Sequence, residues 1–296
     1  MSMLNVKGNT YCIDTGNSSI PFYKINAKDI IMLDTGLKKG ERDIVNNILE
    51  ENNFNVAGII NSHGHIDHTG NNIYLKNKYN SIIAMSAYES IICSSESNLK
   101  VYYGYQSLKD IKKHYGHIVS KADIIIEENQ DELIMCEVKF KIIHTPGHSP
   151  GHICIVTPDE VVYLGDTLVS YDIMKDAKIP YTYILSEDMK SKSMLYDLNY
   201  SKYIIAHKGI YDNIKKLIDD NIDFYEDIAM KILEIVSVPM TMEEIMKCAV
   251  KKLAIKIHDI YKYYFIQMML KSYVEYLYEI EKLNVIIDDG VLKYSK

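Results

Sequence analysis

The densest group of chemically functional side chains lies in the ten-residue segment NSHGHIDHTG, which begins at Asn61. Four of its side chains, His63, His65, Asp67 and His68, are of types that bind divalent metals. The segment follows a short apolar run. If that run is a strand, His63 and His65 project to the same side, because side chains alternate along a strand. Asp67 and His68 then lie on the following turn, so one strand end can supply ligands to two neighbouring metal ions.

Three further candidate ligands follow later in the chain, each at the end of an apolar run. His148 lies between glycine- and proline-rich turns, Asp166 follows Gly165, and His207 precedes a Lys-Gly pair. Each lies where a strand gives way to a loop, the position at which a rigid scaffold presents functional groups. Taken singly, each could merely cap a strand or stabilise its own turn. Behind the first segment, the three together indicate a composite metal site.

The ordered series of these seven residues resembles the signature of the metallo-β-lactamase superfamily. The resemblance covers about the first 210 residues and extends to a glyoxalase II-like, intracellular branch with a winged-helix-like C-terminal domain. It implies an α+β fold, a four-layer αβ/βα sandwich, with two mixed sheets face to face and helices outside. It also implies a two-metal site at one edge of the sandwich.

Carried over residue by residue, the resemblance assigns His63, His65 and His148 to the first metal. Asp67, His68 and His207 would bind the second, and Asp166 would bridge the two. Asp34, in the segment IMLDTG, resembles an early aspartate of the family, which we expect to support a ligand rather than to be one.

Two divalent ions about 3.5–4 Å apart can hold a hydroxide, polarise a carbonyl or phosphoryl oxygen and stabilise a leaving group. Bound water then ionises near neutral pH, so no serine or cysteine nucleophile is required. Asp67 is expected to act catalytically as well, by accepting a hydrogen bond from the attacking hydroxide. Nitrogen and oxygen ligands suit zinc, the metal we expect, and also iron or manganese.

Length and composition fit an ordinary soluble globular protein with one large domain and a small one, or two of medium size. The 296 residues carry a net charge of −7 and are 47% hydrophobic, which is typical of a globular protein. No apolar run reaches membrane-spanning length, and the start lacks the blocks of a signal peptide. The five cysteines are scattered, so we expect reduced, buried thiols and a cytoplasmic location.

Hydrophobic patterns predict the elements that position the site: short strands up to about residue 210, with helices between them. The expected strands are Thr10–Asp14, Ser19–Ile25, Asp29–Leu33, Val56–Ser62, Ser81–Met85, Ile124–Ile126, Val138–His144, His152–Thr157 and Val161–Leu164. The expected helices are Glu41–Asn52, Gly70–Tyr79 and Glu187–Leu198. We therefore predict a catalytic domain at residues 1–210.

The remaining residues, 211–296, predict a small, mostly helical domain. Thr241 and Glu244 form a capping-box pattern that starts a helix after Pro239. Asp289-Gly290 is a hairpin signal between two apolar runs. Three helices and a terminal hairpin resemble a winged-helix domain.

Charge argues against nucleic acid as a partner of this tail, although it stays open as an alternative. Ten lysines face twelve acidic residues from Asn221 to Lys296, a net charge of about −2, whereas a nucleic-acid binder should be basic. We expect the tail to cover the mouth of the site or to form a subunit contact, with a homodimer as one form of it. The expected partner is a small-molecule substrate, with no membrane.

Other histidines and tyrosines receive less weight. His114 and His117 are expected to be solvated. His144 and His152, beside the His148 loop, are expected to pack ordinarily, with support of the ligands as the alternative. The tyrosines of the segment Glu96–Lys121 are expected to face substrate or a second subunit.

The predicted function is hydrolysis of a small-molecule ester, thioester or lactone by a dinuclear-metal-bound hydroxide. A metal-dependent phosphodiesterase or ribonuclease is the first alternative, and the missing basic patch argues against it. A secreted β-lactamase and a non-catalytic binding protein are weaker alternatives, the latter because a dead scaffold has no physical need for seven metal ligands.

Overall fold

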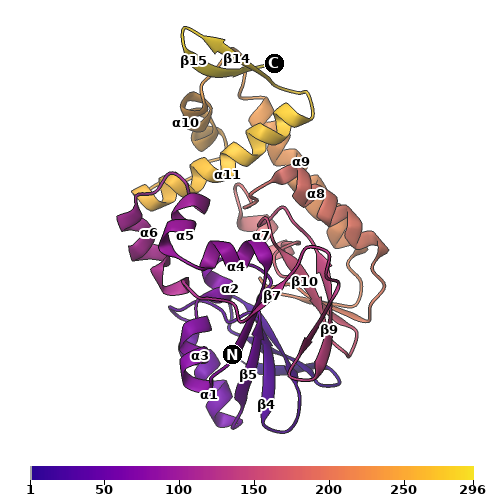
Figure 1. The fold of residues 1–296 in the computed structure, drawn as a ribbon. Helices are drawn as coiled ribbons and strands as arrows, with labels where there is room; N and C mark the ends of the chain where they lie inside the picture. Colours follow the sequence, from indigo (N-terminus) through magenta and orange to yellow (C-terminus); the bar gives the residue numbers. More distant parts are fainter. Residues whose placement is uncertain (1) are drawn as a thin grey trace.

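The computed structural model describes residues 2–296 and contains two mixed sheets packed face to face (Figure 1). The first sheet has the order β1-β2-β3-β4-β5-β6-β7, antiparallel from β1 to β4 and parallel from β4 to β7. Its strands are β1 Ser2–Lys7, β2 Thr10–Asp14, β3 Ser19–Lys24, β4 Asp29–Leu33, β5 Asn55–Ile60, β6 Ile82–Ser86 and β7 Ile124–Ile126. The second sheet has the order β13-β12-β11-β10-β9-β8, in which only β11 and β12 are parallel. Its strands are β8 Glu132–Met135, β9 Val138–His144, β10 Ile153–Val156, β11 Val161–Tyr163, β12 Lys202–Ile204 and β13 Ile210–Tyr211.

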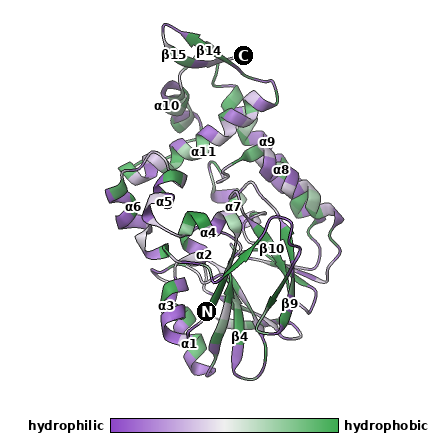
Figure 2. Ribbon diagram, in the orientation of Figure 1, coloured by the Kyte–Doolittle hydropathy of each residue, from purple (hydrophilic) through white to green (hydrophobic). Residues whose placement is uncertain are grey.

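The period-two pattern of the buried strands creates the four layers. In β4, Ile31 and Leu33 point into the core between the two sheets, whereas Ile30 and Met32 point to the outer core under the helices. In β10 of the other sheet, Ile155 faces the same central core, and its neighbours face the outer helices. The central strands β4, β10 and β11 are covered on both faces and read as nearly continuous apolar runs, which are mostly green in Figure 2.

Helices cover the outer faces and connect the strands. Those associated with the first sheet are α1 Arg42–Glu51, α2 Ile66–Thr69, α3 Asn72–Tyr79, α4 Ala87–Cys93, α5 Glu96–Tyr102, α6 Leu108–Tyr115 and the 3₁₀ helix η1 Gly116–Ile118. The helices between β11 and β12 of the second sheet are α7 Tyr171–Asp176, α8 Leu185–Met194 and the 3₁₀ helix η2 Leu195–Asp197. The predicted α+β sandwich is confirmed.

The C-terminal region is helical, as predicted, and ends in a hairpin distant from the two sheets (Figure 1). Its elements are α9 Lys215–Leu233, α10 Met242–Lys252, α11 Ile260–Glu279, β14 Asn284–Asp288 and β15 Val291–Ser295. The predicted capping box is confirmed, because Glu244 N donates to Thr241 Oγ1 at 3.2 Å and Thr241 N donates to Glu244 Oε2 at 2.8 Å. Asp289 and Gly290 both have positive φ, as a tight hairpin turn requires. The winged-helix resemblance stays a prediction.

One apolar cluster joins this region to the sandwich. It contains Val169, Ile179 and Leu185 from before residue 211, together with the buried faces of α9, α10 and α11. The domain boundary at residue 211 stays a prediction, but the core runs across it without interruption.

Several expectations needed correction. The strand expected at Val56–Ser62 ends at Ile60, so His63 and His65 lie beyond it. The edge strands β1, β8 and β13 were not predicted, because an edge strand buries too few side chains to show a clear pattern. All five cysteines are free, but Cys248 is exposed rather than buried. No helix within residues 2–296 has the length and apolarity needed to cross a membrane.

Candidate metal centre

The seven predicted ligands come together at one edge of the sandwich, where the carboxyl ends of strands from both sheets meet. His63 follows β5, His148 follows β9, Asp166 follows β11 and His207 follows β12. His65 is the N-cap of the single-turn helix α2, which carries Asp67 and His68. Strands from both sheets end at this edge, so residues far apart in sequence become neighbours.

Three histidines form the first group of potential ligand atoms. His63 Nε2 lies 2.8 Å from His65 Nδ1, and His148 Nε2 lies 3.1 Å from the same His65 nitrogen. Strand alternation was expected to bring His63 and His65 together, but this explanation is wrong because β5 ends at Ile60, before both residues. They converge because the backbone at His65 is extended before the helical turn, so His65 presents Nδ1 where His63 presents Nε2.

The second group consists of Asp67, His68, Asp166 and His207. Asp166 Oδ2 lies at its centre, 3.5 Å from His68 Nε2 and 3.4 Å from His207 Nε2. The same oxygen is only 3.3 Å from His148 Nε2 of the first group. Asp166 therefore lies between the two groups, as a bridging ligand would. Asp67 Oδ2 lies 3.2 Å from His207 Nε2 and completes the second group.

Burial keeps the three histidines of the first group in the neutral form. Burial lowers the pKa of His65 to about 4 and holds the pKa values of His63 and His148 well below the ordinary value. These three imidazoles are therefore neutral at neutral pH, which is the form that binds metal.

The second group is electrostatically different. Burial lowers the pKa of His68, but the carboxylates of Asp166, Asp34 and Asp67 outweigh it and raise that pKa well above its usual range. Asp166 likewise raises the pKa of His207. Without a metal ion, protons on these histidines balance the buried carboxylates, and a divalent cation could replace them.

Unpartnered polar atoms provide a direct test of whether metal ions fit. The buried polar atoms of residues 2–296 that lack a hydrogen-bond partner include His68 Nε2 and Asp166 Oδ1. Buried polar atoms nearly always have partners, so their orphaned state at this point indicates missing ligands. Both atoms belong to side chains of the second group. The donor set and these orphaned atoms fit metal binding.

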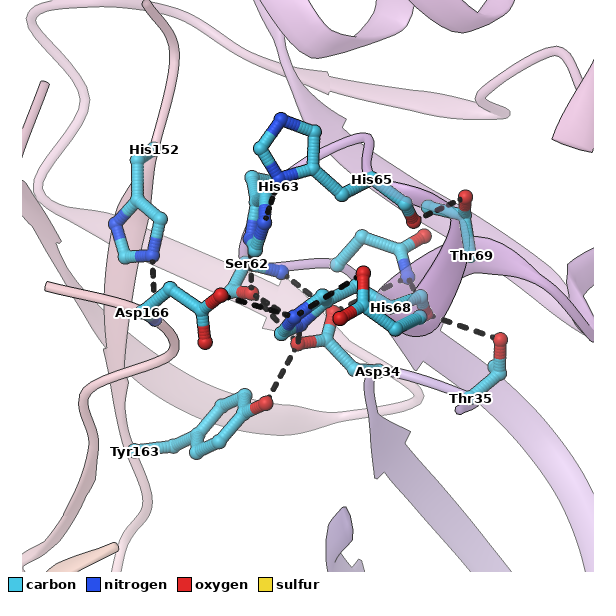
Figure 3. Close-up of polar contacts among 12 residues, drawn as sticks. Asp34, Thr35, Ser62, His63, His65, His68, Thr69, His152, Tyr163 and Asp166 are labelled. Carbon is cyan, nitrogen blue, oxygen red and sulfur yellow. Dashed lines mark hydrogen bonds and ion pairs between the residues drawn. The ribbon is translucent and has the colours of Figure 1, made fainter. Parts of the chain in front are cut away.

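A buried network around Asp34 orients His68 (Figure 3). Asp34 Oδ2 lies 2.7 Å from His68 Nδ1 and accepts hydrogen bonds from Ser62 Oγ at 2.6 Å and Tyr163 OH at 2.7 Å. Ser62 Oγ also lies 3.0 Å from His63 Nδ1. Asp34 therefore holds His68 Nδ1 directly and His63 Nδ1 through Ser62. This matches the supporting role expected for Asp34.

Two further residues hold the ligand loops: Glu89, which sequence reasoning missed, and His152, for which it gave a supporting role only as the alternative. Glu89 on α4 is buried and accepts hydrogen bonds from Gly64 N at 2.7 Å and Gly151 N at 2.8 Å, and so joins the loops that carry His63 and His148. His152 Nε2 accepts a hydrogen bond from Asp166 N at 3.0 Å. Burial lowers the pKa of His152 to about 3, so it is a neutral acceptor with a structural task beyond ordinary packing.

Glycine is required next to Asp166. Gly165 has a φ of +51°, and a Cβ atom there would lie 2.5 Å from His152 Nε2. Only glycine allows the β11 loop to pass so close to His152.

The segment that follows α4 supplies a ligand support that sequence reasoning did not identify. Tyr102 OH lies 3.0 Å from His65 Nε2 and 3.0 Å from Tyr181 OH. Tyr102 is buried, although the tyrosines of this segment were expected to face substrate or a subunit. No sequence signal separates Tyr102 from its neighbours, because the contact depends on how α5 folds back over the site. His114 and His117 are not part of either ligand group.

A buried ion pair lies behind the His148 loop. Lys192 Nζ is 2.6 Å from Asp188 Oδ2, and both side chains are completely buried. A Cβ atom at Gly147 would lie 2.1 Å from Asp188 N, so the loop packs directly on α8. This close contact with α8 holds the loop that carries His148 in position beside the other ligands.

Comparisons with known proteins agree with this geometry. The family model described as "Metallo-beta-lactamase superfamily" matches residues 14–207. The chain belongs to the metallo-β-lactamase superfamily. A hydroxyacylglutathione hydrolase of Pelagibacter ubique is 30% identical over 214 residues, which cover 68% of this chain and 74% of that protein. A hydroxyacylglutathione hydrolase of Haemophilus influenzae is 27% identical over 195 residues, which cover 63% of this chain and 83% of that protein.

Solved structures extend the similarity in fold to the whole chain. A metallo-β-lactamase family protein of Thermus thermophilus has a TM-score of 0.72 at 15% identity and covers 97% of this chain and 98% of its own. A β-lactamase domain protein of Burkholderia ambifaria has a TM-score of 0.70 at 14% identity and covers 100% of this chain and 93% of its own. The sandwich and its helical C-terminal region therefore recur together. This superfamily member is a hydrolase with a cluster of metal-binding residues.

Replacing Tyr102 with phenylalanine should weaken metal binding by about tenfold or more, because His65 loses the partner that fixes its ring. The measurement is a competition titration of zinc against a chromogenic chelator. Tyr105→Phe, at an exposed tyrosine of the same segment, is the matched control and should bind metal like the wild type. Unchanged affinity in Tyr102→Phe would show that the hydroxyl has no supporting role.

Proposed function

We propose that this protein hydrolyses a small-molecule thioester, ester or lactone with the help of two divalent metal ions, of which zinc is the first choice. The single observation that carries the proposal is the position of Asp166 Oδ2, within 3.5 Å of ligand nitrogens from both groups. A carboxylate in that position suits a bridge between two cations. His63, His65 and His148 would hold one ion, and Asp67, His68 and His207 the other.

When bound, two such ions would activate water at neutral pH and polarise the substrate's carbonyl oxygen. The protein side chains then have defined tasks. Asp67 lines the cavity in front of the ligands and is partly exposed to it, so its carboxylate can accept a hydrogen bond from the attacking water. For a thioester, water adds to the carbonyl carbon, the C–S bond breaks, and the products are a carboxylic acid and a thiol.

The names of relatives support thioesters as the first candidates among the possible substrates. Relatives that align with most of this chain are named hydroxyacylglutathione hydrolases, and such substrates are thioesters. The nucleophile required for this chemistry is water, and the site supplies the ligands to activate it without a serine or cysteine. The five free cysteines also support a reducing compartment, for which we propose the cytoplasm.

Removal of metal tests the proposal directly. Metal-loaded protein should release thiol from a panel of thioesters, and protein stripped with a chelator should lose that activity and regain it on addition of zinc. The expected loss is at least 100-fold, because the nucleophile depends on metal activation. Full thioesterase activity after complete stripping would refute the metal-dependent function.

Replacing Asp67 with asparagine should lower kcat by about 100-fold, because the amide cannot take up a proton from the attacking water. The metal content of each sample should be measured with its rate, so that loss of a ligand is separated from loss of a proton acceptor. Asp159→Asn, at a carboxylate that caps the β1–β2 turn outside the metal-ligand groups, is the control. A variant at Asp67 that keeps its metal and the full rate would contradict this role.

A further inference from the structure

The metal-ligand groups form one end of a cavity of about 600 Å³. Its walls include His65, Asp67, His148, Asp166 and His207, and also residues of α11. Cavities of this size accept ligands larger than a short polar acyl group. Because the ligand side chains line it, a substrate must occupy this cavity in order to react.

Most of the remaining lining is apolar. Val169, Ile179, Ile266 and Met269 line it and belong to the apolar cluster that joins the C-terminal helices to the sandwich. Tyr181 and Phe265 add an aromatic wall, with ring centroids 5.6 Å apart and planes 12° from parallel. Tyr181 also lies against His65 and His148, with ring centroids 4.9 and 5.0 Å away, so the apolar wall begins at the metal ligands.

Three lysines give the same cavity a positive side. Lys178, Lys256 and Lys262 all line it, and within residues 2–296 none has a carboxylate oxygen within ion-pair distance. Lys262 is held over the ring of Phe265, with Nζ 5.4 Å from its centroid. Apart from the metal-ligand carboxylates, Asp176 is the acidic side chain of this lining. These three lysines outnumber Asp176, so this part of the lining is positive although the whole chain carries a net charge of −7.

We propose that the substrate is an anionic thioester with a long apolar acyl group. The acyl chain would occupy the apolar space between α11 and the metal centre, and the anionic group of the thiol would contact the lysines. This assignment rests on the proposed hydrolysis for its scissile bond, but the recognition of chain and charge follows from the cavity alone. The C-terminal helices thus form the specificity wall of the site.

Binding of inert analogues separates recognition from turnover. The probes are thioethers, which cannot be hydrolysed, with ethyl or octyl chains on three thiols: N-acetylcysteamine (neutral), glutathione (carboxylates) and phosphopantetheine (phosphate). Isothermal titration of the metal-loaded protein should give an octyl Kd at least about 100-fold below the ethyl Kd, because each buried CH₂ contributes a factor of about four. The two anionic thiols should bind more tightly than the neutral one, and the better of them identifies the anion as carboxylate or phosphate.

Variants assign the two parts of the cavity. Phe265→Ala should reduce the ratio of the ethyl Kd to the octyl Kd. The double variant Lys178→Glu, Lys262→Glu should reduce the ratio of the neutral Kd to the anionic Kd by about tenfold or more. Lys28→Glu is the matched charge control: this exposed residue precedes β4, at the end of the strand away from the metal centre, and should change neither ratio. Thermal unfolding of each variant confirms that it is folded.

The two proposals fail separately. Equal affinity for ethyl and octyl probes, or for neutral and anionic probes, would overturn the recognition inferred here even if short neutral thioesters are hydrolysed. Selective binding of the octyl anionic probes without hydrolysis of the corresponding thioesters would uphold the recognition and refute thioester hydrolysis at this site.

Discussion

The arrangement of the whole site depends on how buried negative charge is compensated at the seam between the two sheets. Asp166, Asp67 and Asp34 lie close to His68, and Asp166 is almost completely buried. Charges removed from water in this way are costly unless cations or protons oppose them. Divalent cations bound by the two ligand groups around Asp166 would neutralise these buried carboxylates. The loops from both sheets, the hydrogen bonds around Asp34 and those that Glu89 accepts from two ligand loops all hold these groups together.

Much of the fold could be read from the sequence where burial is strong on both faces of a sheet. Residues 29–33 were predicted with their observed bounds, because alternate side chains feed two different apolar cores. The terminal hairpin and the capping box were also predicted, because both depend on local backbone chemistry. The strand before the metal segment was predicted too long, since nothing in the pattern marks its end. The edge strands β1, β8 and β13 were missed because an edge strand buries too few side chains, whereas the edge strand β7 was predicted with its observed bounds.

Some residues of the candidate site could be predicted from the sequence, and others could not. The seven potential ligands are readable because metal chemistry needs few residue types, and each follows an apolar strand. Tyr102, Glu89 and His152 were not readable, because tyrosine, glutamate and histidine have many uses and only the tertiary fold brings these three to the ligand loops. The role of the tail could be stated only as an alternative from sequence. The observed contact of α11 with the cavity favours the alternative in which the tail covers the site.

The C-terminal helices also explain why the cavity has its shape. Tyr273 OH on α11 donates to Pro180 O at 3.1 Å, and Leu185 N donates to Ser272 Oγ at 3.1 Å. These bonds fix the loop that carries Tyr181, which in turn contacts the metal-ligand histidines. A change in the tail can therefore alter both substrate space and ligand position, and we regard the two regions as one functional unit.

The most direct test of this account is the metal content of the protein, measured by elemental mass spectrometry after purification without chelator. Two ligand groups that share Asp166 predict about two divalent ions per chain, and fewer in Asp166→Asn. A wild-type chain that holds no more than one ion, with the same content in Asp166→Asn, would contradict the bridging carboxylate and the dinuclear site built on it.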